Sequence, residues 1–375
     1  MPLRAGAARL DITPKAACFL AGYEARSKPH EGVHIPLSLR ALYVHGEKDA
    51  EAVVISADIL WWSAKAAGEA RAAIRSELGI PEESCLLAGT HTHSAPDDRN
   101  AEYLGSLAGH ALAAAALAKD RARPVKLSLA RGKSNIGVNR REKRADGTVC
   151  LGHNPKGPAD REIIVLSVDS LSGKPVARAA NFACHGVVLG GDSYVLSGDW
   201  PGMAARVIEA HTGGAPFLFL NGGAGNVNPK VGPQSDLVPV AEIADEFFGD
   251  YVAALKNLES LWGGLARVMG AELPIALPAK EGNKAVSVPL HGLRIGGLKI
   301  LGYPGEMFSE TAMAVKKAEA GPAMVCGYVD AGDFGYVPTR EAYRDGGYEV
   351  DVTPFAETAE EILRKGLIEL AGELD

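Results

Sequence analysis

The chain has 375 residues, of which 47% are hydrophobic and 23% charged, and its formal net charge is −7. This composition is that of an ordinary globular protein, and the length suits one large domain or two fused domains. Because the net charge is negative and no basic block interrupts the sequence, we expect no nucleic-acid partner.

The N-terminal segment and the cysteines indicate the cellular compartment of the protein. The chain opens on MPLRAGAARLDITP, which lacks the apolar segment of a secretory signal. No stretch reaches the roughly 18 apolar residues that a membrane-spanning helix needs. The five cysteines are widely spread without a CxxC pair, and three lie in apolar runs, as reduced core residues do. These features predict a soluble cytoplasmic protein with no membrane span.

Strand-like and helical segments alternate along the chain. Two β-rich runs, 39–44 and 52–59, predict a strand pair, and residues 64–78 have helical periodicity that ends at Gly79. Further predicted strands are 85–89, 125–130, 162–169, 176–184, 215–220, parts of 265–303, and 323–329. Further predicted helices are 101–118, 200–211, 238–258, 308–320 and 354–370, and residues 132–156 are predicted to be a long polar loop. The alternation predicts an α/β fold with mixed β-sheets flanked by helices, in a single domain over residues 1–375.

Two histidines stand two residues apart in AGTHTHSAP, directly after the predicted strand 85–89. In extended backbone, residues two apart point to the same side, so His91 and His93 would project together from the strand end. Neutral imidazole is a good zinc ligand, and this spacing therefore suits a metal. The alternative is a pair of polar residues in a turn before Pro96, and the spacing alone gives both interpretations about equal weight.

Polar residues also follow the predicted strand 176–184. His185 stands in NFACHG, and SGDWPG further along predicts a helix start. Asp199 in that segment is either the N-cap of the helix or a catalytic residue, with about equal weight.

A glycine-rich segment, NGGAGNVNP, follows the predicted strand 215–220. Such a turn lets backbone N–H groups converge on an anion or an oxyanion, unless it is a simple connection. It lacks the lysine of a P-loop and the spacing of a dinucleotide site. Gly223, Asn226 and Asn228 in this segment, with Asp199, are candidate substrate-binding residues.

Glu306 follows GYPG and is predicted to open a helix after a strand, where the helix dipole alone would favour a carboxylate. In α/β sheets, ligands gather at the carboxyl ends of strands. Because His91, His185 and Glu306 each follow a predicted strand, they can converge as metal ligands. Tyrosines in the polar segment 334–349 are by themselves typical of surface or rim residues.

Together these segments resemble the catalytic domain of the neutral, non-lysosomal ceramidases. The matching segments keep the same order and span nearly the whole chain: GAARLDITP, AGYEAR, HIPLSLRAL, ISADIL, GTHTHSAP, VNRR, NPKGPADREI, NFACHGVVLG, SGDWPG, FLNGGAGNVNP, GYPGEMF and GYVPTREAY with GGY. The resemblance implies the α/β fold of that catalytic domain, without the immunoglobulin-like C-terminal domain.

The resemblance also implies a cofactor and a set of roles. It implies Zn²⁺ bound by His91, His185, Glu306 and Tyr336. It implies that His93 and Arg140 polarise the scissile carbonyl or hold the substrate head group, and that Tyr348 is a second active-site tyrosine. Zinc lowers the pKa of bound water toward ~7 and polarises a carbonyl, and neutral donors can stabilise an oxyanion. Manganese or iron can occupy such a site as well.

The chain departs from the ceramidases at one position of the glycine-rich segment. Ceramidases carry a serine there that is considered nucleophilic, and this chain has Asn228. Covalent serine catalysis at that position is therefore impossible, and a metal-activated water is the expected nucleophile, with Ser197 as the weaker alternative. Ceramide must be extracted from a bilayer, and a cytoplasmic chain without an anchor is poorly equipped for that.

The expected function is a zinc-dependent hydrolase that cleaves the amide of a small N-acyl compound, with a small-molecule substrate as its partner. Two alternatives stay open. Basic residues of segment 132–156 suit a carbohydrate, a lactone or an anionic head group, which favours an esterase, lactonase or glycoside hydrolase. Loss of the serine favours a metal-containing binding protein without catalysis. No oligomeric state is predicted.

Overall fold

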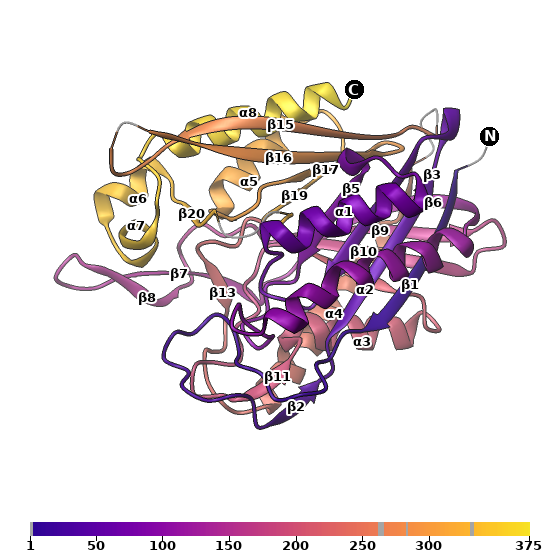
Figure 1. Ribbon diagram of the computed structural model, residues 1–375. Helices are drawn as coiled ribbons and strands as arrows, with labels where there is room; N and C mark the ends of the chain where they lie inside the picture. The colour runs from indigo at the N-terminus through magenta and orange to yellow at the C-terminus, as the bar shows by residue number, and fades with distance from the viewer. Residues whose placement is uncertain (1–2, 262–265, 283, 331–333) are drawn as a thin grey trace.

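The computed structural model of the chain describes residues 3–261, 266–282, 284–330 and 334–375 (Figure 1). The largest sheet has the strand order β12-β10-β9-β6-β1-β3-β4-β5, and β14 pairs with β6. These strands are β1 (Arg4–Asp11), β3 (Ser38–His45), β4 (Glu51–Ala57), β5 (Cys85–Gly89), β6 (Arg123–Lys133), β9 (Glu162–Ser170), β10 (Pro175–Phe182), β12 (Phe217–Asn221) and β14 (Glu259–Ser260).

A second sheet has the order β15-β16-β17-β19. Its strands are β15 (Val268–Pro278), β16 (Ala285–Ile295), β17 (Leu298–Gly302) and β19 (Ala323–Cys326). The smaller sheets join β2 (Gly32–Ile35) with β11 (Val195–Ser197), β18 (Glu306–Met307) with β20 (Tyr336–Val337), and β7 (Gly137–Lys143) with β8 (Val149–Asn154) and β13 (Val227–Pro229).

Helices cover the outer faces of both large sheets (Figure 1). Helices α1 (Ala64–Leu78) and α2 (Ala101–Asp120) pack on β1 and β3 to β5, and α3 (Asp199–His211) and α4 (Val238–Ala254) pack on β9, β10 and β12. Helices α5 (Ser309–Ala318) and α8 (Ala359–Glu373) pack on the second sheet, and the short α6 (Arg340–Asp345) and α7 (Tyr348–Val352) lie between them in sequence. Within the described residues, no helix is both long enough and apolar enough to cross a membrane.

The main core lies between the two large sheets. It includes Val54 and Leu86 from one half of the larger sheet, Leu166 and Leu218 from the other half, and Ile300 from the second sheet. These side chains are at most 1% exposed. Burial of such large aliphatic side chains contributes roughly 1.5–3 kcal/mol each.

The nine-stranded sheet curls, as large twisted sheets do, until its two edges meet. The Ser56 hydroxyl on β4 donates to the Phe219 carbonyl oxygen on β12 at 2.7 Å. The Asn221 side-chain amide at the end of β12 donates to the Thr90 carbonyl oxygen after β5 at 3.3 Å. Strands that lie at opposite ends of the strand order therefore finish beside each other.

Within the two large sheets, three strand pairs are parallel, namely β4 with β5, β10 with β12, and β17 with β19. The strand β5 leads to His91, β10 leads to His185, and β17 leads to Glu306. The mixed sheets confirm the predicted fold class. They also bring together the carboxyl ends at which the sequence places its polar residues.

Several predicted elements differ from the structure. Residues 132–156 are not a loop: β7 and β8 form a hairpin that projects from the molecule (Figure 1) and turns at Gly147, where φ is +89°. The charged side chains of this segment are typical of a loop, so the local sequence does not indicate strands. The strand β7 also pairs with β13 along its other edge, and this long-range contact is not visible in the local sequence. The helix predicted at 354–370 begins at Ala359, since Phe355 instead pairs with Ala279 in an isolated bridge.

Asp330, after β19, fastens the second sheet to β5. Its N–H donates to the Leu87 carbonyl oxygen at 2.6 Å, and its Oδ1 accepts from the Leu87 N–H at 3.0 Å. Its Oδ2 lies 2.5 Å from both Arg71 Nη2 on α1 and His291 Nδ1 on β16. Burial raises the pKa of Asp330, but His291 and Arg71 together hold it below its ordinary value.

We expect Asp330→Asn to lower the free energy of unfolding at pH 7 by about 2 kcal/mol, because charge-assisted hydrogen bonds are lost. A lowered folded-state pKa contributes stability above the unfolded pKa of about 4, and that stability is lost as the pH falls through the folded-state pKa. Urea denaturation at pH 7 and pH 3 should show the difference from wild type narrowing at pH 3. Exposed Asp98→Asn is the control, and an Asp330→Asn difference that did not change with pH would contradict the prediction.

Candidate metal centre

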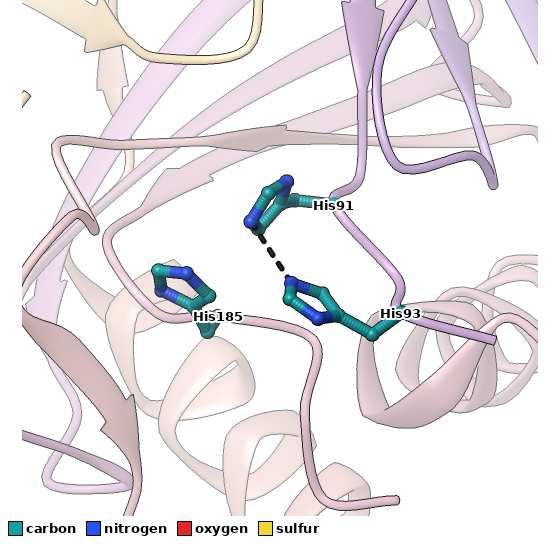
Figure 2. A group of neighbouring side chains, drawn as sticks. All are labelled: His91, His93 and His185. Carbon is teal, nitrogen blue, oxygen red and sulfur yellow. Dashed lines mark hydrogen bonds between the residues drawn. The ribbon is translucent and has the colours of Figure 1, made fainter. Parts of the chain in front are cut away.

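Three histidine side chains converge where the strand ends meet. His91 and His93 follow β5 and His185 follows β10, and one ring nitrogen of each lies within 4.8 Å of the others (Figure 2). The Nε2 atoms of His91 and His93 are 3.2 Å apart. His91 and His185 are fully buried, whereas His93 is only partly buried.

The rings of His91 and His93 meet as predicted, but for a different reason. Strand β5 ends at Gly89, and His91 has φ +64°, in the left-handed region. The alternation of an extended strand therefore does not apply. Hydrogen bonds from the Thr90 N–H to the Ala57 carbonyl oxygen (2.9 Å) and from the His91 N–H to the Ile59 carbonyl oxygen (3.0 Å) hold this turn.

Each imidazole is oriented through its Nδ1 atom by a backbone carbonyl oxygen. The contacts are His91 with Leu60 at 3.1 Å, His93 with Gly22 at 3.1 Å, and His185 with Ala224 at 2.8 Å and Val227 at 3.1 Å. A carbonyl oxygen only accepts, so each Nδ1 carries the proton and each Nε2 presents a lone pair. A hydrogen bond from the other ring nitrogen to a carbonyl oxygen is typical of metal-binding histidines.

The histidine cluster is electrostatically incomplete by itself. Burial lowers the pKa of all three imidazoles well below the ordinary value, because a buried site disfavours the charged form. Neutral His91 and His93 then place the lone pairs of their Nε2 atoms 3.2 Å apart, and these lone pairs repel. A cation among the Nε2 atoms removes that repulsion, so the cluster fits a metal ion.

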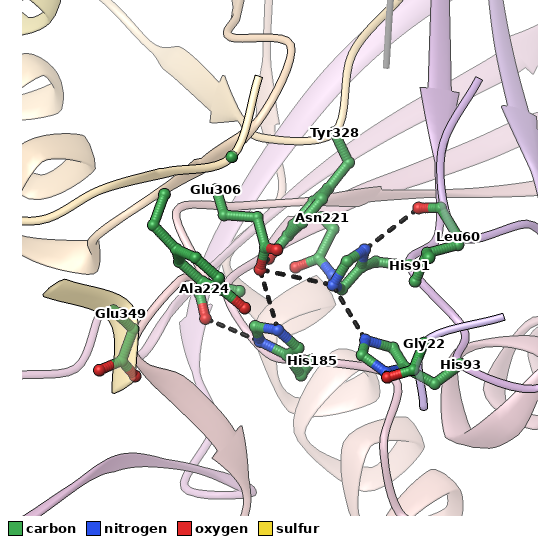
Figure 3. A network of polar contacts seen from close by, with 12 residues as sticks. Gly22, Leu60, His91, His93, His185, Asn221, Ala224, Glu306, Tyr328 and Glu349 are labelled. Carbon is green, nitrogen blue, oxygen red and sulfur yellow. Dashed lines mark hydrogen bonds and ion pairs between the residues drawn. The ribbon is translucent and has the colours of Figure 1, made fainter. Parts of the chain in front are cut away.

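A carboxylate joins the cluster from the small β18–β20 sheet. Glu306 Oε2 lies 3.6 Å from His91 Nε2 and 3.1 Å from His185 Nε2 (Figure 3). Glu306 does not open a helix as predicted, since it lies in β18 and α5 begins at Ser309. In β18 it is the register partner of Tyr336 in β20, and the Tyr336 side chain hydrogen-bonds to it.

The donor atoms lie close to the spacing of a tetrahedral zinc site. Ligands that lie about 2.0–2.2 Å from a tetrahedral ion are about 3.3–3.6 Å from one another. Glu306 Oε2 is 3.6 Å from His91 Nε2, within that range, and 3.1 Å from His185 Nε2, slightly below it. Nitrogen and carboxylate donors suit zinc, although manganese and iron accept the same atoms.

Arg140 on β7 borders this cluster and is buried. One guanidinium nitrogen, Nη1, is 3.2 Å from His185 Nε2 and 3.3 Å from Asn228 Oδ1. The other, Nη2, donates to the Tyr336 hydroxyl at 3.0 Å. Its Nε donates to Glu349 at 2.8 Å, so a buried carboxylate balances the charge.

Tyr348 lies at the rim of the same region. Its side chain is 44% exposed, and its ring centroid is 5.9 Å from that of Tyr336. The Arg140 guanidinium carbon lies 6.0 Å from the Tyr348 ring centroid. The structure thus places Tyr348 beside the predicted site, and its catalytic role stays a prediction.

Two of the candidate substrate-binding residues are engaged in packing against α5. Asn226 donates to Glu310 at 2.7 Å and accepts from the Ser309 N–H at 3.0 Å. Gly223 lies so close to α5 that an added Cβ would stand 2.8 Å from Ala312 Cβ. These contacts fix the glycine-rich turn against the helix that follows Glu306, and any role in substrate binding stays a prediction.

Asp199 is the first residue of α3, with φ +51°, and is fully buried. Its carboxylate accepts from the N–H groups of Val188 (3.1 Å), Leu189 (2.9 Å) and Trp200 (2.7 Å). These bonds join the segment after His185 to the first turn of α3. The N-cap position is Gly198, so the predicted N-cap role of Asp199 is wrong. Its predicted part in substrate binding remains a hypothesis.

Sequence reasoning missed two residues of the site. Glu349 pairs with both Arg140 and Arg141, at 2.8 and 2.6 Å. Tyr328 stacks on His91 (Figure 3), but it stands in the apolar run AMVCGYV and so resembled a core residue. No local pattern marks either residue, since each is recruited by tertiary contacts.

Comparisons with known proteins bear on the fold of the chain. No protein-family model matches the chain. A curated relative, neutral ceramidase A of Dictyostelium discoideum, is 24% identical over 255 residues, which are 59% of this chain and 35% of that protein. The chain therefore spans about a third of the length of that relative.

Two solved structures are similar over the whole chain. The neutral ceramidase from Pseudomonas aeruginosa has a TM-score of 0.80 and 20% identity, and the match covers 100% of this chain and 75% of that one. A ceramidase complexed with C2 has a TM-score of 0.82 and 19% identity, with 100% and 76% covered. The chain has the neutral-ceramidase fold, and the resemblance that its motifs predicted is confirmed.

Proposed function

We propose that the protein is a zinc-dependent hydrolase that cleaves the amide of a small N-acyl compound. The observation that carries the proposal is the carboxylate of Glu306 packed against the Nε2 atoms of His91 and His185, beside the buried cation Arg140. The similarity to neutral ceramidases supports amide hydrolysis as the reaction. The geometry supports zinc through the donor types and their spacing.

In this proposal, His91, His185, Glu306 and Tyr336 hold the metal. A bound zinc ion supplies Lewis-acid polarisation and lowers the pKa of a water molecule. The backbone carbonyl oxygens of Leu60 and Ala224 keep two of the imidazoles in the tautomer that offers Nε2.

The remaining groups of the site act on the substrate. The Arg140 guanidinium, already close to His185, provides fixed positive charge for a developing oxyanion. The Tyr348 phenol is protonated at neutral pH, because its ordinary pKa is about 10 and burial raises it further, so it can donate a hydrogen bond. His93 directs its Nε2 to the same place and completes the set that orients the scissile group.

Water is the nucleophile in this proposal. Asn228 has no nucleophilic oxygen, and its Oδ1 accepts from Arg140 at 3.3 Å. The Ser197 side chain is fully buried, and its hydroxyl accepts from the Asp199 N–H at 3.0 Å. Asn228 therefore cannot form a covalent intermediate, and Ser197, whose hydroxyl also lies 3.3 Å from His34 Nδ1, remains the weaker alternative.

Ion pairs weaken, but do not remove, the support for an anionic or carbohydrate substrate. It rested on the basic residues of segment 132–156, but Arg140 and Arg141 share Glu349, and Lys143 pairs with Asp345 at 3.2 Å. Ion pairs thus engage much of the positive charge of the β7–β8 hairpin.

A substrate panel under controlled metal loading tests the proposal. Chromogenic N-acyl amides, esters and glycosides would be assayed with the protein as purified, after dialysis against a chelator, and after zinc is returned. We expect amide hydrolysis to fall to background on chelation and to return with zinc. Turnover of esters or glycosides alone would contradict the proposed amide substrate. Bound metal without any turnover would favour a binding protein. Activity that survives chelation would contradict a metal-dependent mechanism.

A further inference from the structure

Tyr328 contacts two of the proposed metal ligands from different sheets (Figure 3). Its ring stacks on the His91 imidazole with centroids 3.8 Å apart and planes inclined by 23°. Its hydroxyl donates to Glu306 Oε2 at 3.4 Å. The side chain is 1% exposed, so both contacts are made away from water.

The backbone at Tyr328 is in an unfavourable conformation that its neighbours hold in place. Its φ is +59°, in the left-handed region, which is rare for a bulky side chain and costs on the order of 1 kcal/mol. Its N–H donates to the Gly305 carbonyl oxygen at 3.1 Å, and its carbonyl oxygen accepts from the Gly89 N–H at 3.0 Å. The main chain of Tyr328 therefore bridges the residue before Glu306 and the end of β5, and Asp330 reinforces that bridge from two residues further on.

We propose that Tyr328 is a positioning residue of the metal centre, which fixes the plane of the His91 ring and the orientation of the Glu306 carboxylate. The inference rests on the proposed function, because it requires these two residues to bind the metal. Stacking limits rotation of the imidazole, and the hydroxyl selects one carboxylate rotamer. The donor atoms then stand 3.6 Å apart without further ordering, which reduces the entropy lost on metal binding.

Two substitutions separate the hydroxyl from the ring. Tyr328→Phe keeps the stacking and removes the hydrogen bond to Glu306, whereas Tyr328→Leu removes both. Tyr43→Phe is the matched control, because Tyr43 is also buried and also donates to a glutamate, Glu51, far along the chain from the site. All three variants would be compared with wild type by thermal unfolding.

The measurements are the zinc dissociation constant, by competition with a chromogenic chelator, and the visible absorption spectrum of the cobalt-substituted protein. Outer-sphere partners of metal ligands typically contribute about 10–100-fold to affinity. We expect zinc affinity to fall about 10-fold in Tyr328→Phe and towards 100-fold in Tyr328→Leu, each with a changed cobalt spectrum. Tyr43→Phe should match wild type in both.

The outcomes separate this inference from the function on which it rests. If wild type binds zinc and both Tyr328 variants bind it equally well with an unchanged cobalt spectrum, Tyr328 only fills the core and the inference is wrong. A lower unfolding temperature without a change in affinity has the same meaning. If wild type binds no zinc after reloading, the proposed function fails first and the inference fails with it.

Discussion

The Glu306→Ala and His185→Ala variants are expected to contain no zinc and to hydrolyse N-acyl amides no faster than background. Glu306 Oε2 is within 3.6 Å of two imidazole nitrogens, and His185 Nε2 is the nitrogen closest to it at 3.1 Å. Each substitution removes a donor atom itself. Metal affinity should therefore fall by more than the roughly 100-fold that outer-sphere changes reach.

Elemental analysis of the purified variants beside wild type measures this effect. We expect about one zinc ion per wild-type chain and none in either variant. His93→Ala gives the sharper comparison, because His93 lies in the same cluster but has the proposed role of orienting the substrate. It should retain zinc and lose activity, whereas His153→Ala on the exposed β8 strand should change neither.

Either of two results would revise the assignment. If His93→Ala lost zinc and Glu306→Ala retained it, the metal ligands would be the three imidazoles and not Glu306. Full activity in a variant without zinc would reject the metal as the source of catalysis. Circular dichroism on each variant excludes unfolding as the cause of a loss.

The convergence of the site was predictable because it depends on a local rule about strand ends. His91, His185 and Glu306 each follow an apolar run that forms a strand, and the curl of the large sheet brings strands from its two ends together. The rule needs only the order of strands and polar residues, which a sequence shows directly. The fold class followed from the same alternation.

The failures share a different cause, which is pairing between segments far apart in sequence. Segment 132–156 becomes a hairpin because β13 supplies a partner more than 80 residues later, and Glu306 enters a strand because it pairs with Tyr336. The left-handed backbone at His91 and Tyr328 depends on hydrogen bonds from other strands. Local propensity does not contain such information, since tertiary contacts override it.

Arg140→Ala is expected to lower kcat by about 100- to 1,000-fold, the range seen when one oxyanion donor is removed, while zinc content stays at the wild-type level. The guanidinium contacts His185 Nε2 and the Tyr336 hydroxyl, so it lies beside the metal without supplying a donor atom to it. If His185 Nε2 held the metal, its lone pair would no longer accept from Arg140 Nη1, and this N–H would be free to bind the substrate. Glu349 keeps its ion pair with Arg141 at 2.6 Å, so the substitution leaves no buried carboxylate without a partner, and the chain should fold.

Two further variants decide whether charge or geometry matters at this position. Arg140→Lys restores the charge but not the planar fork that reaches Glu349, Tyr336 and His185 together, so it should recover only part of kcat. Arg141→Ala is the matched control, because Arg141 binds the same Glu349 but has no contact to the three histidines among the described residues. Steady-state kinetics with metal analysis on the same samples would contradict the proposed role if Arg140→Ala kept its kcat or lost its zinc. A lower kcat with zinc retained would show that Arg140 stabilises charge on the substrate and does not hold the metal. The positions of the three histidines and Glu306 do not by themselves distinguish these two roles.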